Sequence, residues 1–162
     1  MFDGQDVLDI AREHDGAKYV LGARAPLTNK NWTGPWDCAE LASWCAYQAY
    51  NIIFGASPRD PMRADAYTGF WWDDSVSNNA QCSVDEAIAT PGAFLLRKPG
   101  DFRISIGHIA ISCGDGSTFE ARDARRGVGQ FGGARDRHWS CGVLLPGIRY
   151  TANDLGLTHD PP

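Results

Sequence analysis

The sequence predicts an α+β fold in which N-terminal helices pack on a C-terminal antiparallel β-sheet meander. In the first half, apolar residues recur at helical spacing behind capping residues, whereas after Pro91-Gly92 short apolar runs alternate with tight turns. Turns this short leave no room for crossover helices, so neighbouring strands should run antiparallel. The 162 residues suit one domain, expected over residues 1–150, with residues 151–162 as a loosely held C-terminal tail.

The clearest helix is expected to begin at Cys38. Asp37 and Glu40 form a D-x-x-E capping box, and apolar residues follow at helical spacing to about Tyr50. Asp3, Asp60 and Ser83 precede three further helical segments. The four expected helices are residues 4–14, 38–50, 61–67 and 84–89.

Strands are expected in the second half, where the turn signals are dense. The turn Gly114-Asp115-Gly116 joins two of them into a hairpin. The five expected strands are residues 93–97, 106–112, 117–122, 127–131 and 139–145.

Composition and charge exclude several functional classes. The net charge of −5 and the pI near 5.2 give no basic footprint for nucleic acid. No stretch approaches the roughly 20 apolar residues of a membrane span. The N-terminus lacks the basic and apolar regions of a Sec export signal. We therefore expect neither a nucleic-acid partner nor a membrane span.

The five cysteines are too widely spaced to indicate a metal site. None form a C-x-x-C pair, and the four histidines form no H-x-x-x-H pair, so no metal or cofactor is expected. Because five is an odd number, at least one thiol is unpaired within the monomer. Most of these cysteines are expected to be small buried hydrophobic residues.

Cys38 differs from the other four because it lies at the start of a helix. The N–H groups and macrodipole there stabilise an anion, which should lower the pKa of the thiol and favour a nucleophile. His108, at the start of an apolar strand, is the candidate base, and Glu120 on the next strand can accept its other N–H. Two alternatives remain open: His108 as a structural histidine, and Glu120 as a partner of the neighbouring arginines at 122, 125 and 126. The six tryptophans are expected to be packing residues.

Six short motifs occur in a specific order and spacing. They are Gly16-Ala17-Lys18-Tyr19, Asp37-Cys38-Ala39-Glu40-Leu41, Pro91-Gly92-Ala93, Gly107-His108-Ile109-Ala110-Ile111, Gly114-Asp115-Gly116 and Glu120-Ala121. Together, over about residues 10–145, they resemble the NlpC/p60 family of papain-like cysteine peptidases. The resemblance implies a papain-like fold. It also implies hydrolysis of an amide bond in peptidoglycan stem peptides, commonly between D-glutamate and the following diamino acid.

The resemblance also assigns roles to individual residues. It maps the nucleophile to Cys38, the base to His108 and the third polar residue to Glu120, acting through a thioacyl-enzyme. It places Tyr19 near the nucleophile, where the hydroxyl would help to hold the oxyanion or substrate. Asp37 matches a position that can contact a free amine of the substrate.

The sequence departs from the family pattern at several positions. Ala39 and Glu40 replace the usual Ser-Gly, Glu120 replaces the more common histidine, and Ala93 replaces an aspartate. The charge of Glu40 should raise the pKa of the thiol unless the capping box occupies that side chain. The insert over residues 58–89 is where substrate specificity would be built.

Three alternative functions are left open. The first is a CHAP-like N-acetylmuramoyl-L-alanine amidase, and the second is an amidase or acyltransferase acting on a small molecule or protein. The third is a non-catalytic binding module on the same fold. Without a Sec signal, a wall hydrolase would be made in the cytoplasm and delivered by a phage or a secretion machine, with a phage-tail or secretion carrier or an immunity protein as partner. Excision from a longer exported protein is the other route to the cell wall or periplasm.

Overall fold

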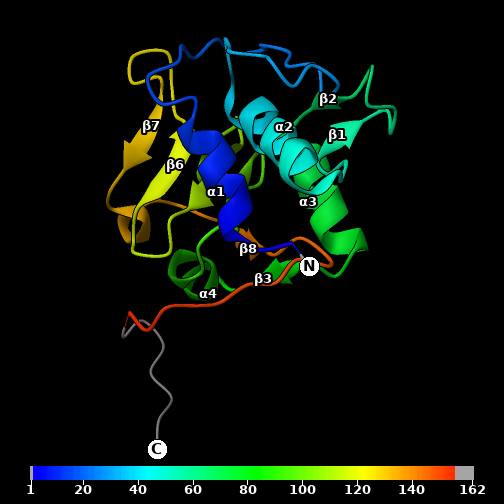
Figure 1. Ribbon diagram of the computed structural model, residues 1–162. Coiled ribbons are helices and arrows are strands. Elements are labelled where there is room, and N and C mark those ends of the chain that lie inside the picture. The colour runs from blue at the N-terminus through cyan, green and yellow to red at the C-terminus, as the bar shows by residue number, and fades with distance from the viewer. Residues whose placement is uncertain (1, 156–162) are drawn as a thin grey trace, which may run out of the picture.

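The computed structural model describes residues 2–155 and confirms the α+β class (Figure 1). Helices α1 (Gln5–Arg12) and α2 (Cys38–Tyr50) lie side by side on one face of the sheet, and α3 (Thr68–Ser77) packs beside α2. The short helix α4 (Val84–Ala89) covers the other face. None of the helices within residues 2–155 is long and apolar enough to cross a membrane.

Three of the four expected helices are present; Asp37 and Ser83 cap two of them, whereas Gly4 and not Asp3 is the N-cap of α1. The Asp3 carboxylate accepts the Gln5 N–H at 2.9 Å before α1. Ser83 accepts the Glu86 N–H at 3.0 Å before α4. Helix α2 ends at Tyr50, and its C-cap, Asn51, adopts the left-handed conformation.

The helix expected over residues 61–67 is wrong. Asp60 accepts the Met62 N–H at 3.0 Å and forms a turn, and strand β2 (Asp65–Ala66) follows and pairs with β1 (Ala56–Ser57). The helix of this insert, α3, begins only at Thr68. Its Trp71 is fully buried against Phe54 and Phe94, a tertiary contact that short-range spacing does not reveal.

The main sheet is antiparallel and six-stranded, but it is not a simple meander. Its order is β3-β8-β4-β5-β6-β7. The strands are β3 (Gln81–Cys82), β4 (Phe94–Arg97), β5 (His108–Ser112), β6 (Thr118–Ala121), β7 (Val128–Phe131) and β8 (Cys141–Val143). Strands β4 to β7 form the expected meander. Strand β8 returns to pair with β4, and β3 joins it from the helical half, a long-range pairing that the turn pattern does not encode.

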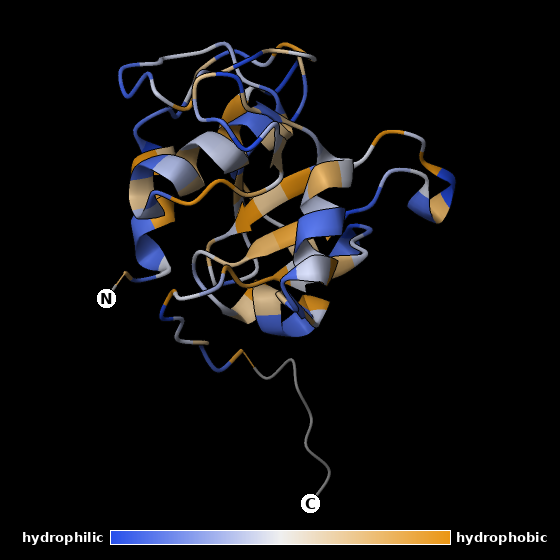
Figure 2. Ribbon diagram, turned by 90° about the vertical axis from the view of Figure 1, so that its right-hand side faces the viewer, coloured by the Kyte–Doolittle hydropathy of each residue, from blue (hydrophilic) through white to orange (hydrophobic). Residues whose placement is uncertain are grey.

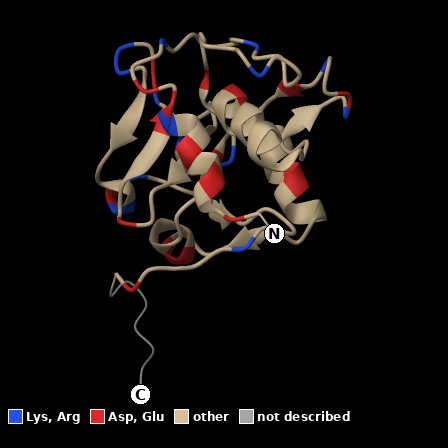
Figure 3. Cartoon of the chain, in the orientation of Figure 1, with Lys and Arg blue, Asp and Glu red and all other residues tan. Residues whose placement is uncertain are grey.

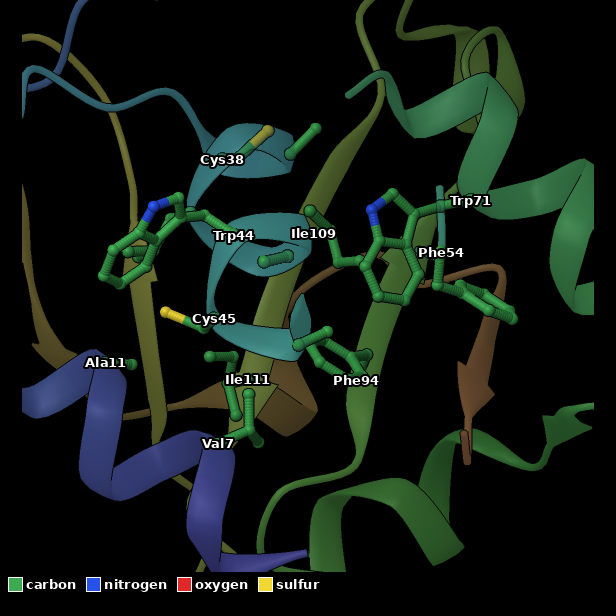
Figure 4. Packing of buried hydrophobic residues seen from close by; sticks show 14 of the residues in the cluster. Val7, Ala11, Cys38, Trp44, Cys45, Phe54, Trp71, Phe94, Ile109 and Ile111 are labelled. Atoms are coloured by element: carbon green, nitrogen blue, oxygen red, sulfur yellow. The ribbon is translucent and has the colours of Figure 1, made fainter. Parts of the chain in front are cut away.

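Alternating residues of the central strands fill two apolar clusters. Ile109 and Ile111 face α1 and α2, where they join Phe94, Trp44 and Trp71 (Figure 4). Leu95 and Ala110 face α4 and Trp139 on the other side. Apolar residues accordingly dominate the strands in Figure 2. Helix α2 is buried along most of its length, and Glu40 is the one charged residue within it, whereas charges are frequent on the loops and on α1 (Figure 3).

Part of the expected tail is attached to the domain. The Asn153 N–H donates to the Ala89 carbonyl at 2.7 Å, and its side-chain amide donates to the Gly114 carbonyl at 2.8 Å. The chain therefore stays against α4 at least to this point, as Figure 1 shows. The rest of the predicted tail, residues 156–162, lies outside the described residues.

Candidate active site

Cys38 is the first residue of α2, as the capping pattern predicts. One Asp37 carboxylate oxygen accepts the Glu40 N–H at 2.9 Å, and the other accepts the Gly22 N–H at 3.2 Å. These bonds fix the start of the helix and tie it to the loop that follows α1. The Cys38 side chain lies at the wall of a cavity of about 310 Å³, and the residue is 9% exposed.

The expectation of a lowered pKa for this thiol is wrong. Burial raises the pKa of Cys38 to about 12, and the neighbouring Asp37 carboxylate adds to the rise. The N–H groups of Ile109 and Ala39 act in the opposite direction but do not outweigh the loss of water. The resting protein therefore holds a neutral thiol, and attack on a substrate requires a base to take its proton.

Glu40 completes only half of the predicted capping box. Its carboxyl group does not return to Asp37 but accepts the N–H groups of Ala25 at 3.2 Å and Ala66 at 3.1 Å. Burial, together with the neighbouring Asp65 carboxyl, raises the pKa of Glu40 to about 9. Glu40 is therefore uncharged at neutral pH, adds no negative charge beside the thiol, and links two walls of the cavity.

The structure brings the other two predicted residues into direct contact. His108 begins β5, and its Nε2 lies 2.8 Å from Oε1 of Glu120 on β6. Ile111 pairs with Phe119 and Ser112 with Thr118, so the histidine and the glutamate lie diagonally across the hairpin. The side chains are 9% and 0% exposed, respectively. Since an ionised carboxylate only accepts, Nε2 donates to Glu120, and Nδ1 is the ring nitrogen outside this bond.

Glu120 is held by an arginine that sequence analysis did not identify. Arg137 donates to both carboxylate oxygens, at 2.6 Å and 2.8 Å, and the Thr118 hydroxyl also donates to the group. Burial alone would raise the pKa of Glu120, but the hydrogen bonds from Arg137 and His108 outweigh it and lower the pKa to about 2. Glu120 is therefore ionised. The arginine that binds Glu120 is Arg137, and not one of the arginines at 122, 125 and 126 that the sequence analysis considered. Residue 137 lies in an irregular segment, where no local pattern indicates its partner.

The Cys38 thiol lies beside the start of β5, the strand that His108 begins. The Cys38 thiol interacts with the N–H of Ile109, the residue that follows His108. Within residues 2–155 no hydrogen bond joins the thiol to the imidazole. Catalytic contacts of this kind are often long before substrate binds. The arrangement places a neutral thiol, a buried imidazole and an ionised carboxylate in one region of the fold.

The cavity is formed by four separate segments. Tyr19 and Leu21 come from the loop after α1, Asp37 to Ala39 from the start of α2, Ala66 to Thr68 from the β2–α3 junction, and Pro99 and Ser105 to Gly107 from the β4–β5 loop. Burial and the nearby groups of Cys38 and Asp37 raise the pKa of Tyr19, so its hydroxyl stays protonated and can donate. Leu21, Tyr67 and Ile106 are exposed and form an apolar rim that sequence analysis did not identify.

The close packing around residue 107 requires a glycine before His108. A Cβ atom there would lie 2.3 Å from Thr68 Oγ1 and 2.8 Å from the Arg97 carbonyl oxygen. Only glycine therefore lets the β4–β5 loop approach the start of α3. This approach closes one wall of the cavity directly beside the histidine.

All five cysteines are free thiols, and three of them are buried. In the described part of the chain, no three His, Cys, Asp or Glu side chains gather as a metal site would require.

Comparisons with known proteins were made by sequence and by structure. No family model and no curated protein matches the sequence. The structure superposes on the NlpC/p60 domain of the peptidoglycan hydrolase SagA with a TM-score of 0.60 and 20% identity, covering 88% of this chain and 99% of that domain. The superposition on NlpC1 of Trichomonas vaginalis has a TM-score of 0.59 and 17% sequence identity, and it covers 91% of this chain and 44% of NlpC1. The superposition on the P60 domain of the M. avium subspecies paratuberculosis antigen MAP1204 has a TM-score of 0.53 and 19% sequence identity, and it covers 93% of each chain. The chain therefore has the papain-like α+β fold of the NlpC/p60 domains.

Proposed function

We propose that this protein is a cysteine peptidase that hydrolyses an amide bond in peptidoglycan stem peptides, between D-glutamate and the following diamino acid. The observation that carries the proposal is the buried His108–Glu120 pair beside a cavity that reaches a thiol at a helix start. The likeness to the SagA domain supports the choice of peptidoglycan as the substrate.

In the first half of the reaction, the Cys38 Sγ attacks the scissile carbonyl carbon while His108 Nδ1 takes the thiol proton. Because the thiol is neutral at rest, this proton transfer accompanies the attack. The Cys38 N–H belongs to the first turn of α2, where N–H groups have no intrahelical partner, so it can donate to the oxyanion. The protonated Tyr19 hydroxyl is a second donor at the cavity wall.

In the second half, the carbon–nitrogen bond breaks and protonated His108 gives its proton to the leaving amine. Water then attacks the thioester and transfers a proton to His108, and the acid is released as the thiol regains its proton. Throughout, Glu120 accepts the Nε2–H and holds the ring in one orientation. Asp37 is committed to the helix cap through Gly22 and Glu40, but it lines the cavity and remains available to a substrate amine.

Purified sacculi and mass spectrometry of the released peptides test the proposal. The parent protein should release fragments cut after D-glutamate, and Cys38→Ala should reduce the rate by more than about 10⁴-fold, because the nucleophile is removed. Cys113→Ala is the matched control, since this half-buried thiol is not among the residues that line the cavity. It should retain the parent rate. Peptide release by Cys38→Ala at the parent rate would contradict the mechanism.

The product masses also separate the alternatives. Release of whole stems beginning with L-alanine would indicate an N-acetylmuramoyl-L-alanine amidase. Binding to sacculi without any release would indicate a non-catalytic binding module.

A second candidate is an amidase or acyltransferase for a substrate with an apolar acyl group. The apolar rim of Leu21, Tyr67 and Ile106 favours it. In addition, no lysine or arginine occurs among the described residues that line the cavity, although stem peptides carry carboxylates. Faster turnover of an uncharged acyl anilide than of stem peptides would favour this candidate.

A further inference from the structure

Every accepting direction of the Glu120 carboxylate is occupied. Oε1 accepts from His108 Nε2 at 2.8 Å and from Arg137 at 2.6 Å. Oε2 accepts from Arg137 at 2.8 Å and from the Thr118 hydroxyl. A carboxylate with two oxygens offers about four lone-pair sites, so this group is saturated and cannot rotate without breaking a bond. The histidine is therefore oriented by a carboxylate that is itself fixed.

Arg137 is held by stacking as well as by its hydrogen bonds to Glu120. Its side chain is 18% exposed, and its guanidinium lies over the Trp139 ring, 4.7 Å from the centroid. The Trp139 indole N–H donates to the Ala134 carbonyl at 3.0 Å, and the same ring lies 6.0 Å from the His108 ring. A planar guanidinium that both stacks and forms two parallel hydrogen bonds is a geometry that lysine cannot reproduce.

The charges around the His108–Glu120 pair are predominantly positive. Glu120 is the negative group, and Arg137 and Arg122 lie around it. Arg97 on β4 is directly opposite His108 in the sheet, and burial and the Arg137 charge lower its pKa. Helix α2 contributes the Cys38 thiol, which lies near the N–H of Ile109. A bare carboxylate at 2.8 Å would favour the protonated imidazole, whereas a carboxylate paired with Arg137 does so much less.

We propose that Arg137 is a positioning residue that fixes Glu120 and offsets its charge, so that His108 stays neutral and ready to accept the thiol proton. This inference rests on the proposed function and extends it to a fourth residue. A neutral thiol needs a neutral base: the proton moves from Sγ to Nδ1, so an imidazole that is already protonated cannot accept it. Arg137 therefore allows a carboxylate to orient His108 while the imidazole remains able to accept the proton of a neutral thiol.

The test is an NMR titration of His108 in protein carrying Cys38→Ala, without substrate. A His108→Gln spectrum assigns its signal among the four histidines. Arg137→Met keeps an apolar chain over Trp139 and removes the charge, and it should raise the pKa of His108 by about one unit or more. Glu120→Gln should lower the pKa. The double variant should return to within about 0.5 unit of the parent value, because the two charges offset each other.

Activity provides the second readout. With Cys38 intact, Arg137→Met should shift the acid limb of kcat/KM upward by the same amount as the NMR pKa. Arg137→Lys keeps the charge but loses the two parallel bonds, so the NMR pKa should stay near the parent value while kcat/KM falls. Arg135→Met, which removes an exposed charge two residues away, is the matched control and should change neither quantity.

An unchanged or lowered pKa of His108 in both Arg137→Met and Arg137→Lys, with the far-UV spectrum of the parent, would overturn the inference and leave Arg137 a structural residue. If Arg137→Met does not fold, a parent-like pKa in Arg137→Lys combined with an unshifted acid limb and an unchanged kcat/KM would do the same. Absence of hydrolysis by the parent bears on the proposed function alone, because the titration requires no substrate.

Discussion

Two buried glutamates near the candidate nucleophile show opposite ionisation. Glu40 and Glu120 are each 1% exposed. Glu40 accepts two backbone N–H groups and lies beside the Asp65 carboxyl, and its pKa is raised to about 9. Glu120 is bound by Arg137 and His108, and its pKa is lowered to about 2. Burial is the same for both, so the charge of the partners decides which carboxyl is ionised.

The difference divides the site into a structural part and a chemical part. The uncharged Glu40 joins the loop at Ala25 to the strand at Ala66 and keeps two cavity walls together. The ionised Glu120 holds the imidazole of His108, the proposed base. Helix α2, which carries the candidate nucleophile Cys38, therefore has an uncharged carboxyl group two residues after it.

The largest expected effect comes from removing the ionised member. Glu120→Ala leaves the mostly buried Arg137 without its partner, so the free energy of unfolding should fall by about 3 kcal/mol, measured by urea denaturation. Hydrolysis should also decrease, but less than in Cys38→Ala, because the site loses the group that orients His108 but keeps the nucleophile. Combining it with Arg137→Met should recover part of the stability, since the unpaired charge is then removed. No recovery in the double variant would contradict this account.

A smaller loss is expected for the uncharged member. Glu40→Ala leaves the N–H groups of Ala25 and Ala66 without their acceptor, which should lower the free energy of unfolding by about 2 kcal/mol. Denaturation of Glu13→Ala, an exposed glutamate, provides the control and should stay within about 0.5 kcal/mol of the parent. A loss for Glu40→Ala no larger than for Glu13→Ala would show that Glu40 does not hold the cavity walls.

The sharpest test of the comparison is the pH dependence of stability. The folded pKa of Glu120, about 2, is below its unfolded value near 4.3, so its contribution is present above about pH 4.3 and is lost as the pH falls toward 2. The folded pKa of Glu40, about 9, is above its unfolded value, so its contribution is full below about pH 4.3 and declines as the pH rises toward 9.

The free energy of unfolding, followed against pH for the parent, Glu120→Gln and Glu40→Gln, separates the two. The difference from the parent should shrink toward low pH for Glu120→Gln and toward high pH for Glu40→Gln. Slopes of the same sign for both variants would mean that the two carboxyl groups do not differ in ionisation.

Local chemistry explains which parts of the fold the sequence predicts well. Helix α2 begins at Cys38 because the Asp37 side chain takes an N–H of the first turn, and both groups lie within four residues of each other. The hairpin of β5 and β6 follows from the Gly114-Asp115-Gly116 turn, which brings His108 and Glu120 to adjacent strands. Capping and turn formation depend on residues that are close together in the chain, so a short stretch of sequence is enough to predict them.

Long-range contacts explain what the sequence did not predict. Helix α3 forms where Trp71 enters the core. The strand expected over residues 139–145 is present as β8, but no local signal places it between β3 and β4. The partner of Glu120 is 17 residues away in an irregular segment. Such pairings depend on how distant elements pack, and no spacing rule encodes them.

The sequence by itself determined the α+β class, the start of the helix that carries Cys38 and the hairpin that carries His108 and Glu120. Only the tertiary structure decided the charges of the site: a neutral Cys38 thiol, an uncharged Glu40 and a Glu120 held ionised by Arg137. The physical reason is that capping and turn formation depend on neighbours along the chain. The pKa of a buried group depends instead on the water it loses and on the charges that folding brings to it.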